Sequence, residues 1–265
     1  MLSNELNPKT FIIQVVVFAI ASFLHGITGM AFPMIGTTSL SLSFSLPKAI
    51  MMIAVPSMIM NIIVLFSHNK NGFTNEILFY FKKYWLLIVT SILGSIVGIK
   101  LLLILPVGIM YLLMSIITLA YVVNEFLSEK KIIPSFRVST GVFSTIVFGF
   151  LAGIIGGATN AMSPILMMYL FSKTTNKHEI VKSSNICYFF GKVVQIYLLG
   201  NNINKLSHNE ILLILCITIV SIFFLFFGIK FRSKISNSYF KNTIYIILLL
   251  LGLKVGYSGF QLITP

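Results

Sequence analysis

The chain has 265 residues, of which 57% are hydrophobic and 9% are charged, and 19 Lys and Arg residues against 6 acidic ones give a formal charge of +13. Soluble globular domains carry about 25% charged residues, so a mean hydropathy of +0.98 excludes an ordinary soluble domain and predicts a protein in the lipid bilayer. All six acids are Glu, which excludes chemistry that needs an aspartate. Because the basic residues are scattered between apolar runs, nucleic acid is not an expected partner.

Apolar runs close to the length that a bilayer needs, roughly 17 to 25 residues for a spanning helix, occur five times in each half of the chain. In order they cover residues 10–27, 30–46, 48–66, 84–104 and 107–126, and then 138–155, 158–172, 180–199, 210–230 and 242–262. They predict an all-α polytopic membrane protein with 8–10 transmembrane helices. Because the run 30–46 is short for a crossing, the first two runs of each half are either two spans or one re-entrant hairpin.

The two halves resemble copies of each other at a shift of about 127 to 131 residues. Gly26-Ile27-Thr28-Gly29 matches Gly153-Ile154-Ile155-Gly156, and Gly98-Ile99-Lys100 matches Gly228-Ile229-Lys230. Internal similarity of this kind indicates a structural repeat. We therefore divide the chain into a first transmembrane repeat (1–126), a cytoplasmic linker (127–137) and a second transmembrane repeat (138–265).

Loop charges predict how the repeats are oriented, since Lys and Arg in short loops favour the cytoplasmic side. With the N-terminus outside, thirteen of the cations fall on inner loops, and only Lys9, Lys48 and Lys205 fall on the outer side. A fold in which the first two runs merge into one crossing divides the same charges evenly. The uneven split favours an odd number of segments per half, and hence inverted-topology repeats.

We expect a multi-pass protein of the plasma (cell) membrane, and the Lys- and Asn-rich loops are typical of a bacterial chain.

Each half has a Gly-rich break at the end of its first apolar run, from His25 to Pro33 in the first and from Gly149 to Asn160 in the second. We expect these broken helices to lie at the centre of each folded half. Interrupted helices at corresponding positions of inverted repeats indicate a transporter's binding site, because a helix that starts after the break directs free N–H groups into the bundle. The alternative is that small residues only let helices pack closely. The candidate substrate-binding residues in the breaks are Gly26, Thr28, Gly29, Thr37, Gly153, Gly156, Gly157, Thr159 and Asn160.

Three lysines, Lys100, Lys192 and Lys254, lie inside apolar runs. A lysine near mid-bilayer is costly and normally faces a partner or a water-filled cavity, although a long side chain also reaches the interface by snorkelling. Since the glutamates lie in loops or at run ends, an anionic substrate is a candidate counter-charge. Lys192, its repeat counterpart Asn61, and Lys254 therefore join the predicted substrate site.

Histidine and cysteine offer little other chemistry. His25 is the only histidine inside a run, and its titration near neutral pH makes it a candidate proton relay. Cys187 and Cys216 both lie in apolar runs, where a thiol behaves as a small hydrophobe. We predict no metal site and no cofactor.

The duplicated breaks resemble the sulfite exporter TauE/SafE family of membrane permeases. That family's pattern is roughly G-x3-G-x2-G-x-G-G-G, with a proline four residues later, once per half. The second half keeps Gly149, Gly153, Gly156 and Pro164 but has Ala158-Thr159-Asn160 for the glycine triplet, and the first half keeps Gly26 and Gly29 but has Ser22, Ala31-Phe32-Pro33 and Thr37 at the other positions. The resemblance implies transport of a small anion, typically a sulfur-containing one such as sulfite or a sulfonate.

Two other classes remain as alternatives. Gly256-Tyr257-Ser258-Gly259 has the form found around the nucleophile of rhomboid proteases, but Ser258 would need a base and no histidine follows it, so we do not predict an enzyme. A membrane scaffold or accessory subunit stays open, as does a homo-oligomer. The expected partners are a small anion and the lipid bilayer.

Overall fold

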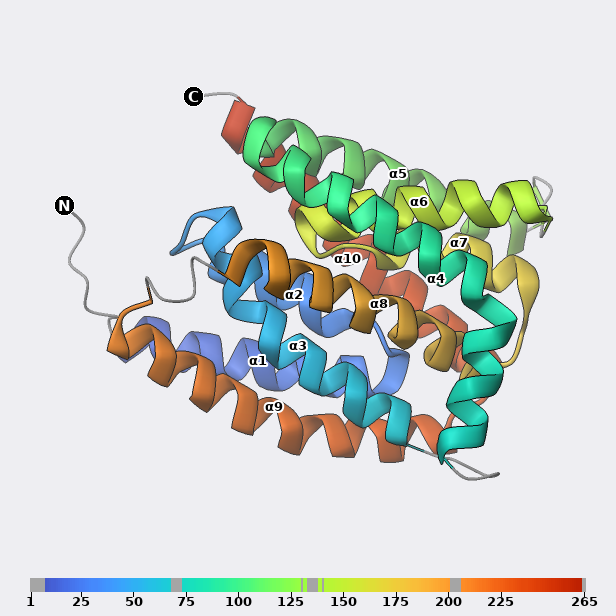
Figure 1. The fold of residues 1–265 in the computed structure, drawn as a ribbon, viewed down its shortest axis with the longest axis horizontal. Helices are drawn as coiled ribbons and strands as arrows, with labels where there is room; N and C mark the ends of the chain where they lie inside the picture. Colours follow the sequence, from blue (N-terminus) through green and yellow to red (C-terminus); the bar gives the residue numbers. More distant parts are fainter. Residues whose placement is uncertain are drawn as a thin grey trace.

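The computed structural model describes residues 8–67, 73–129, 131–132, 138–139, 141–200 and 206–263. Ten α-helices contain most of these residues, and none of them lies in a strand (Figure 1). In chain order the helices are α1 (Pro8–Thr28), α2 (Ala31–Leu40), α3 (Leu46–Phe66), α4 (Phe73–Ile104), α5 (Val107–Glu129), α6 (Val142–Thr159), α7 (Ser163–Lys173), α8 (Lys177–Leu199), α9 (His208–Lys234) and α10 (Asn237–Ile263). The all-α prediction is confirmed, with one helix for each predicted segment.

Seven of these helices are long and apolar enough to cross a membrane, namely α1, α3, α4, α5, α6, α9 and α10. The prediction of 8–10 spanning helices is therefore too high for the part of the chain that the structure describes. Helices α2 and α7 have 10 and 11 residues, which is about 15 to 17 Å at 1.5 Å per residue and roughly half of a 30 Å hydrocarbon core. Helix α8 is long enough, but Lys177, Glu179, Lys182 and Lys192 make it too polar.

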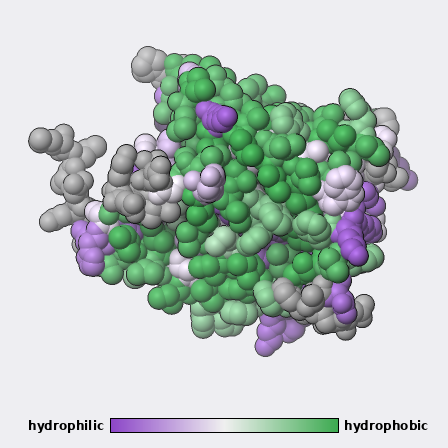
Figure 2. Space-filling model, in the orientation of Figure 1, coloured by the Kyte–Doolittle hydropathy of each residue, from purple (hydrophilic) through white to green (hydrophobic). Residues whose placement is uncertain are grey.

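The three helices that do not qualify form the interior of the bundle. Most residues of α2, α7 and α8 are buried, whereas α9 exposes large side chains such as Phe223, Phe226 and Phe227. Figure 2 shows a surface covered mostly by hydrophobic side chains. Soluble proteins rarely expose contiguous apolar surface on this scale, so the outer helices are suited to lipid.

The helices of the two halves pack against each other in a symmetric pattern. Helix α1 of the first half packs along α9 of the second, and α6, the counterpart of α1, packs along α4, the counterpart of α9. Two further pairs of counterparts pack against each other, α3 with α8 and α5 with α10. Consecutive helices run in opposite directions along the bundle (Figure 1). With five helices per half, this alternation makes the second half run opposite to the first, as inverted repeats require.

Glycines allow the paired helices to approach closely. A Cβ built on Gly26 would lie 2.7 Å from the Cα of Gly228, and one built on Gly153 would lie 2.9 Å from the Cα of Gly94. In these contacts the residue of α4 that corresponds to Gly228 is Gly94. The sequence comparison matched Gly228 with Gly98 instead, which lies one helical turn later on α4. Gly98 lies on the same face of α4 and meets the backbone of Ile154. Small residues at such crossings let backbones approach and pack.

The charges follow the two ends of the bundle. Alternating helix directions place the C-terminal end of α9 and the N-terminal ends of α4, α8 and α10 at one end, together with Lys83, Lys177, Lys234 and Lys241. Lys48 lies at the opposite end, in the first turn of α3, and forms an ion pair with Glu210 at 2.6 Å. The predicted linker 127–137 lies largely outside the described residues.

Candidate functional site

The two helix breaks use the same backbone device. Helix α1 ends at Thr28 and is followed by Gly29 with φ of +77°, and α6 ends at Thr159 and is followed by Asn160 with φ of +63°. Glycine adopts this left-handed conformation at no steric cost, and asparagine is one of the few other residues that visit it. The N–H of Gly29 donates to the carbonyl of His25 at 2.6 Å, and that of Asn160 donates to Gly156 at 3.0 Å. Asn160 thus ends its helix and also supplies a polar side chain.

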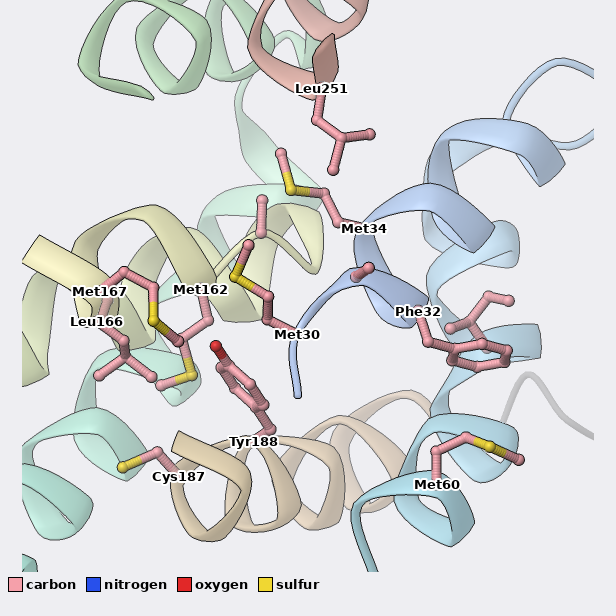
Figure 3. Close-up of a cluster of buried hydrophobic side chains, with 14 of the residues drawn as sticks. Met30, Phe32, Met34, Met60, Met162, Leu166, Met167, Cys187, Tyr188 and Leu251 are labelled. Carbon is pink, nitrogen blue, oxygen red and sulfur yellow. The ribbon is translucent and has the colours of Figure 1, made fainter. Parts of the chain in front are cut away.

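The breaks of the two halves meet at the centre of the bundle. The Asn160 side chain donates from Nδ2 to Thr37 Oγ1 of α2 at 2.7 Å, and Ser163 Oγ of α7 donates to the carbonyl of Met30 in the first break at 3.4 Å. Tyr188 Oη of α8 donates to the same Ser163 Oγ at 3.1 Å. Figure 3 shows Met30 of the first break and Met162 of the second near each other, with Tyr188 pointing toward them. Residues that are more than 120 positions apart in the sequence therefore share one site.

A buried amine is the central group of this site. Lys192 on α8 is 5% exposed, and its Nζ donates to Asn160 Oδ1 and, at 2.7 Å, to Gln195 Oε1. Gln195 Nε2 in turn donates to Asn160 Oδ1 at 2.8 Å and to the carbonyl of Gly156 at 3.2 Å. Among the described residues no carboxylate forms an ion pair with Lys192. A buried cation without a counter-ion is costly. Here two amide oxygens accept from the ammonium group, and an anion bound beside it would supply the counter-charge.

A small cavity adjoins this amine. The space left is about 20 Å³, which holds about one water molecule. Its walls come from both breaks, from α8 and from α4. The lining residues are Pro33, Ser95, Gly156, Asn160, Met162, Ser163, Tyr188, Gly191, Lys192 and Gln195. The breaks are therefore closed around the amine in this conformation.

The structure brings part of the predicted site together. Thr37, Gly156, Asn160 and Lys192 belong to the network or to the cavity wall. Gly157 contributes its carbonyl, which accepts from Gln195 Nε2 at 3.3 Å.

Other predicted residues have packing contacts instead. Gly26 and Gly153 lie where helices cross, and Gly157 also meets the backbone of Ser95. The hydroxyls of Thr28 and Thr159 donate to carbonyls one turn earlier in their own helices, at 2.7 Å each. A role for these residues in binding substrate stays a prediction.

Three further candidates lie outside the cavity wall. Lys254 is on the exposed surface of α10. His25 is fully buried, and its Nδ1 accepts from the N–H of Phe32 at 3.4 Å, so it contacts the start of α2. Asn61 is fully buried on α3, and neither polar atom of its side chain has a hydrogen-bond partner within the described part of the chain.

Two amides on α8 were missed in the sequence, and each supports one break. Gln195 holds the end of α6, as described above, and Asn185 Nδ2 donates to the carbonyl of Gly29 at 2.9 Å. Gln195 is three residues after Lys192, a spacing that puts both on one helix face, so the lysine could have indicated it. Nothing in the sequence distinguishes Asn185 from the other asparagines.

An all-α bundle with two inverted halves, each with an interrupted helix, is the architecture of many membrane transporters. The family model described as sulfite exporter TauE/SafE matches residues 14–255, which is nearly the whole chain. The chain therefore belongs to this family of membrane transporters. No curated protein and no solved structure matches it.

Proposed function

We propose that the chain is a permease of the plasma membrane that moves a small anion, of the sulfite and sulfonate class, through a site formed by Lys192, Asn160, Thr37 and Gln195. The observation that carries the proposal is the buried Lys192 amine, whose hydrogen-bond acceptors among the described residues are amide oxygens. An anion that enters this site would supply the missing counter-charge. The proposal assigns no catalytic role to Ser258, because the family consists of transporters.

The helix starts beside the amine support the same substrate charge. Helix α7 begins at Ser163, three residues after Asn160, and α2 begins at Ala31. The N-terminus of a helix carries free N–H groups and a partial positive charge, which together favour an anion. Lys192 and the N-terminus of α7 therefore both favour a negatively charged substrate.

Transport requires the closed breaks to open. Sulfite is larger than a water molecule, so a space of about 20 Å³ does not admit it without a rearrangement. The contact between the breaks depends on few polar bonds, chiefly Asn160 with Thr37 and Ser163 with the carbonyl of Met30. We therefore expect the halves to separate at these bonds when the substrate enters or leaves.

Uptake of radiolabelled sulfite into vesicles that contain the purified full-length protein tests the proposal. Loss of a hydrogen bond to a charged group costs about 1.5–3 kcal/mol, so Lys192→Gln is expected to reduce the uptake rate by about tenfold or more. Lys100→Gln is the matched control, because it makes the same change at a lysine that lies inside an apolar run but is exposed on α4. The control is expected to keep the wild-type rate, and a Lys192→Gln variant that also keeps it would contradict the site.

A further inference from the structure

A second buried cation, Arg232, lies two residues before the C-terminal end of α9. Its side chain is 1% exposed, the lowest exposure of any charged residue in the described core. Nη2 donates to Ser67 Oγ, just past the end of α3, at 2.8 Å. Nε and Nη1 have no hydrogen-bond partner within the described part of the chain, and no carboxylate described there forms an ion pair with Arg232.

Other cations surround this guanidinium. Lys177 and Lys182 of α8 are 9% and 2% exposed. Lys177 Nζ donates to the carbonyl of Arg232 itself at 3.0 Å, and Lys182 Nζ donates to that of Leu65 on α3. Both lysines and His25 lie within electrostatic range of Arg232, and Glu76 is the acid in range of Lys182. The region therefore has more positive than negative charge.

A bracing role between α3 and α9 explains only part of this arrangement. The single bond to Ser67 is enough to join the two helices, yet within the described residues it leaves the N–H of Nε and those of Nη1 without acceptors. Each buried donor that stays unsatisfied costs about 1–3 kcal/mol, and more when it is charged. The planar guanidinium suits oxoanions, which accept several of its N–H groups at once.

Asn61 continues the polar lining from Arg232 toward the centre of the bundle. It lies one turn before Leu65 on the same face of α3, and Leu65 is the residue whose carbonyl Lys182 contacts. Neither polar atom of the Asn61 side chain has a hydrogen-bond partner among the described residues. Nε2 of His25, which is also fully buried, lacks one there too.

We propose that Arg232 forms a second anion site, distinct from the one at Lys192 and nearer the basic end of the bundle. The ligand is an oxoanion that accepts from the Nε and Nη1 groups of Arg232. The inference rests on the proposed function for one point, that this oxoanion is also the transported substrate. The two sites then lie in series, and an anion at Arg232 waits one step before or after the Lys192 site.

Equilibrium binding of radiolabelled sulfite to the purified full-length protein tests the second site, because it counts bound anions without depending on transport. The wild type is expected to bind two per chain. The Arg232→Gln variant is expected to bind one anion, at Lys192, and the double variant with Lys192→Gln is expected to bind none. The Lys192→Gln variant alone is expected to bind one anion, at Arg232. Lys230→Gln, the same charge change at an exposed position two residues away, is expected to bind two.

The outcomes separate the two proposals. One anion in the wild type, unaffected by Arg232→Gln and lost in Lys192→Gln, overturns the second site and leaves the proposed function intact. Binding that depends on Arg232 but not on Lys192 overturns the proposed transport site instead, and no binding in the wild type overturns both. If Arg232→Gln does not fold, Arg232→Lys keeps the charge with fewer donors and is expected to weaken one of the two sites at least threefold. An unchanged second affinity in a folded Arg232→Lys variant contradicts the proposal.

Discussion

The break after α1 and the break after α6 have the same backbone and different chemistry. Both long helices end in a left-handed residue, Gly29 or Asn160, and both are followed by a half-length helix. Around the first break the contacts are the imidazole of His25 and the amide of Asn185. Around the second they are Asn160, Lys192 and Gln195, so among the described residues a cation hydrogen-bonds to the second break and not to the first.

Comparison of the two breaks shows that the halves share their backbone geometry but not their polar side chains. Counterpart positions keep the geometry, as the equivalent crossings at Gly26 and Gly153 demonstrate. The polar side chains are not repeated, since the counterpart of Lys192 is the uncharged Asn61. Helix α8 supports both breaks, through Asn185 and Gln195. A single asymmetric site can therefore form within a symmetric frame.

Valine at the helix crossings gives the largest expected effect and tests the symmetric part of the comparison. Gly26→Val and Gly153→Val would each place a side chain against backbone atoms of a neighbouring helix. Such overpacking costs about 1–3 kcal/mol and occasionally more, and backbone atoms cannot move aside as a flexible side chain would. We expect both variants to lose the folded, monodisperse protein in size-exclusion chromatography. Gly200→Ala, which meets nothing within 4 Å, is the control. A variant pair in which only one crossing is sensitive would show that the halves do not pack alike.

Leucine at the two amides of α8 tests the asymmetric part. Gln195→Leu removes a partner of Asn160 and Lys192, a loss of about 1–3 kcal/mol, so we expect a lower melting temperature and, in addition, sulfite uptake per folded molecule that falls about tenfold or more. Asn185→Leu leaves the carbonyl of Gly29 without its donor, so we expect lower thermal stability and uptake per folded molecule within about threefold of wild type. Uptake and melting temperature measured on both variants give the comparison, and a reversed pattern would mean that the first break binds the substrate.

Removal of the Ser163 hydroxyl gives the smallest expected effect and probes the contact between the breaks. Ser163 accepts from Tyr188 at 3.1 Å and donates weakly to the carbonyl of Met30 at 3.4 Å. We expect Ser163→Ala to lower the stability by about 1 kcal/mol. The control is Ser233→Ala near the exposed end of α9, which is expected to have no effect. A loss much larger than 1 kcal/mol would show that this hydroxyl, rather than Asn160, is the main link between the halves.

The sequence predicted the helices better than their roles. Apolar runs locate every helix because the bilayer requires them, but they do not reveal that α2 ends at Leu40, where the hydroxyl-rich stretch after it turns back. They also classify α8 as an ordinary span, although its polar residues belong to the interior. Helix pairings such as α1 with α9 depend on tertiary contacts that no local pattern contains.

For the site, charge was the informative signal. Lys192 was recognisable because a lysine in an apolar run is expensive, and Asn160 because it follows the break. Gln195 and Asn185 carry no charge and stand in no motif, so only the fold shows that they hold the breaks. Arg232 follows an apolar run directly and was counted as a loop charge, yet the approach of α3 and α8 buries it. Proximity to a run end does not determine burial.

The central claim is that an anion binds between Lys192 and Asn160. Anomalous diffraction from crystals of the full-length protein soaked with selenite, a heavier analogue of sulfite, tests it most directly because selenium can be located by itself. The account predicts a selenium peak beside Lys192, with a selenite oxygen within hydrogen-bond distance of Nζ. A protein that transports selenite but shows no selenium between the two breaks would contradict it.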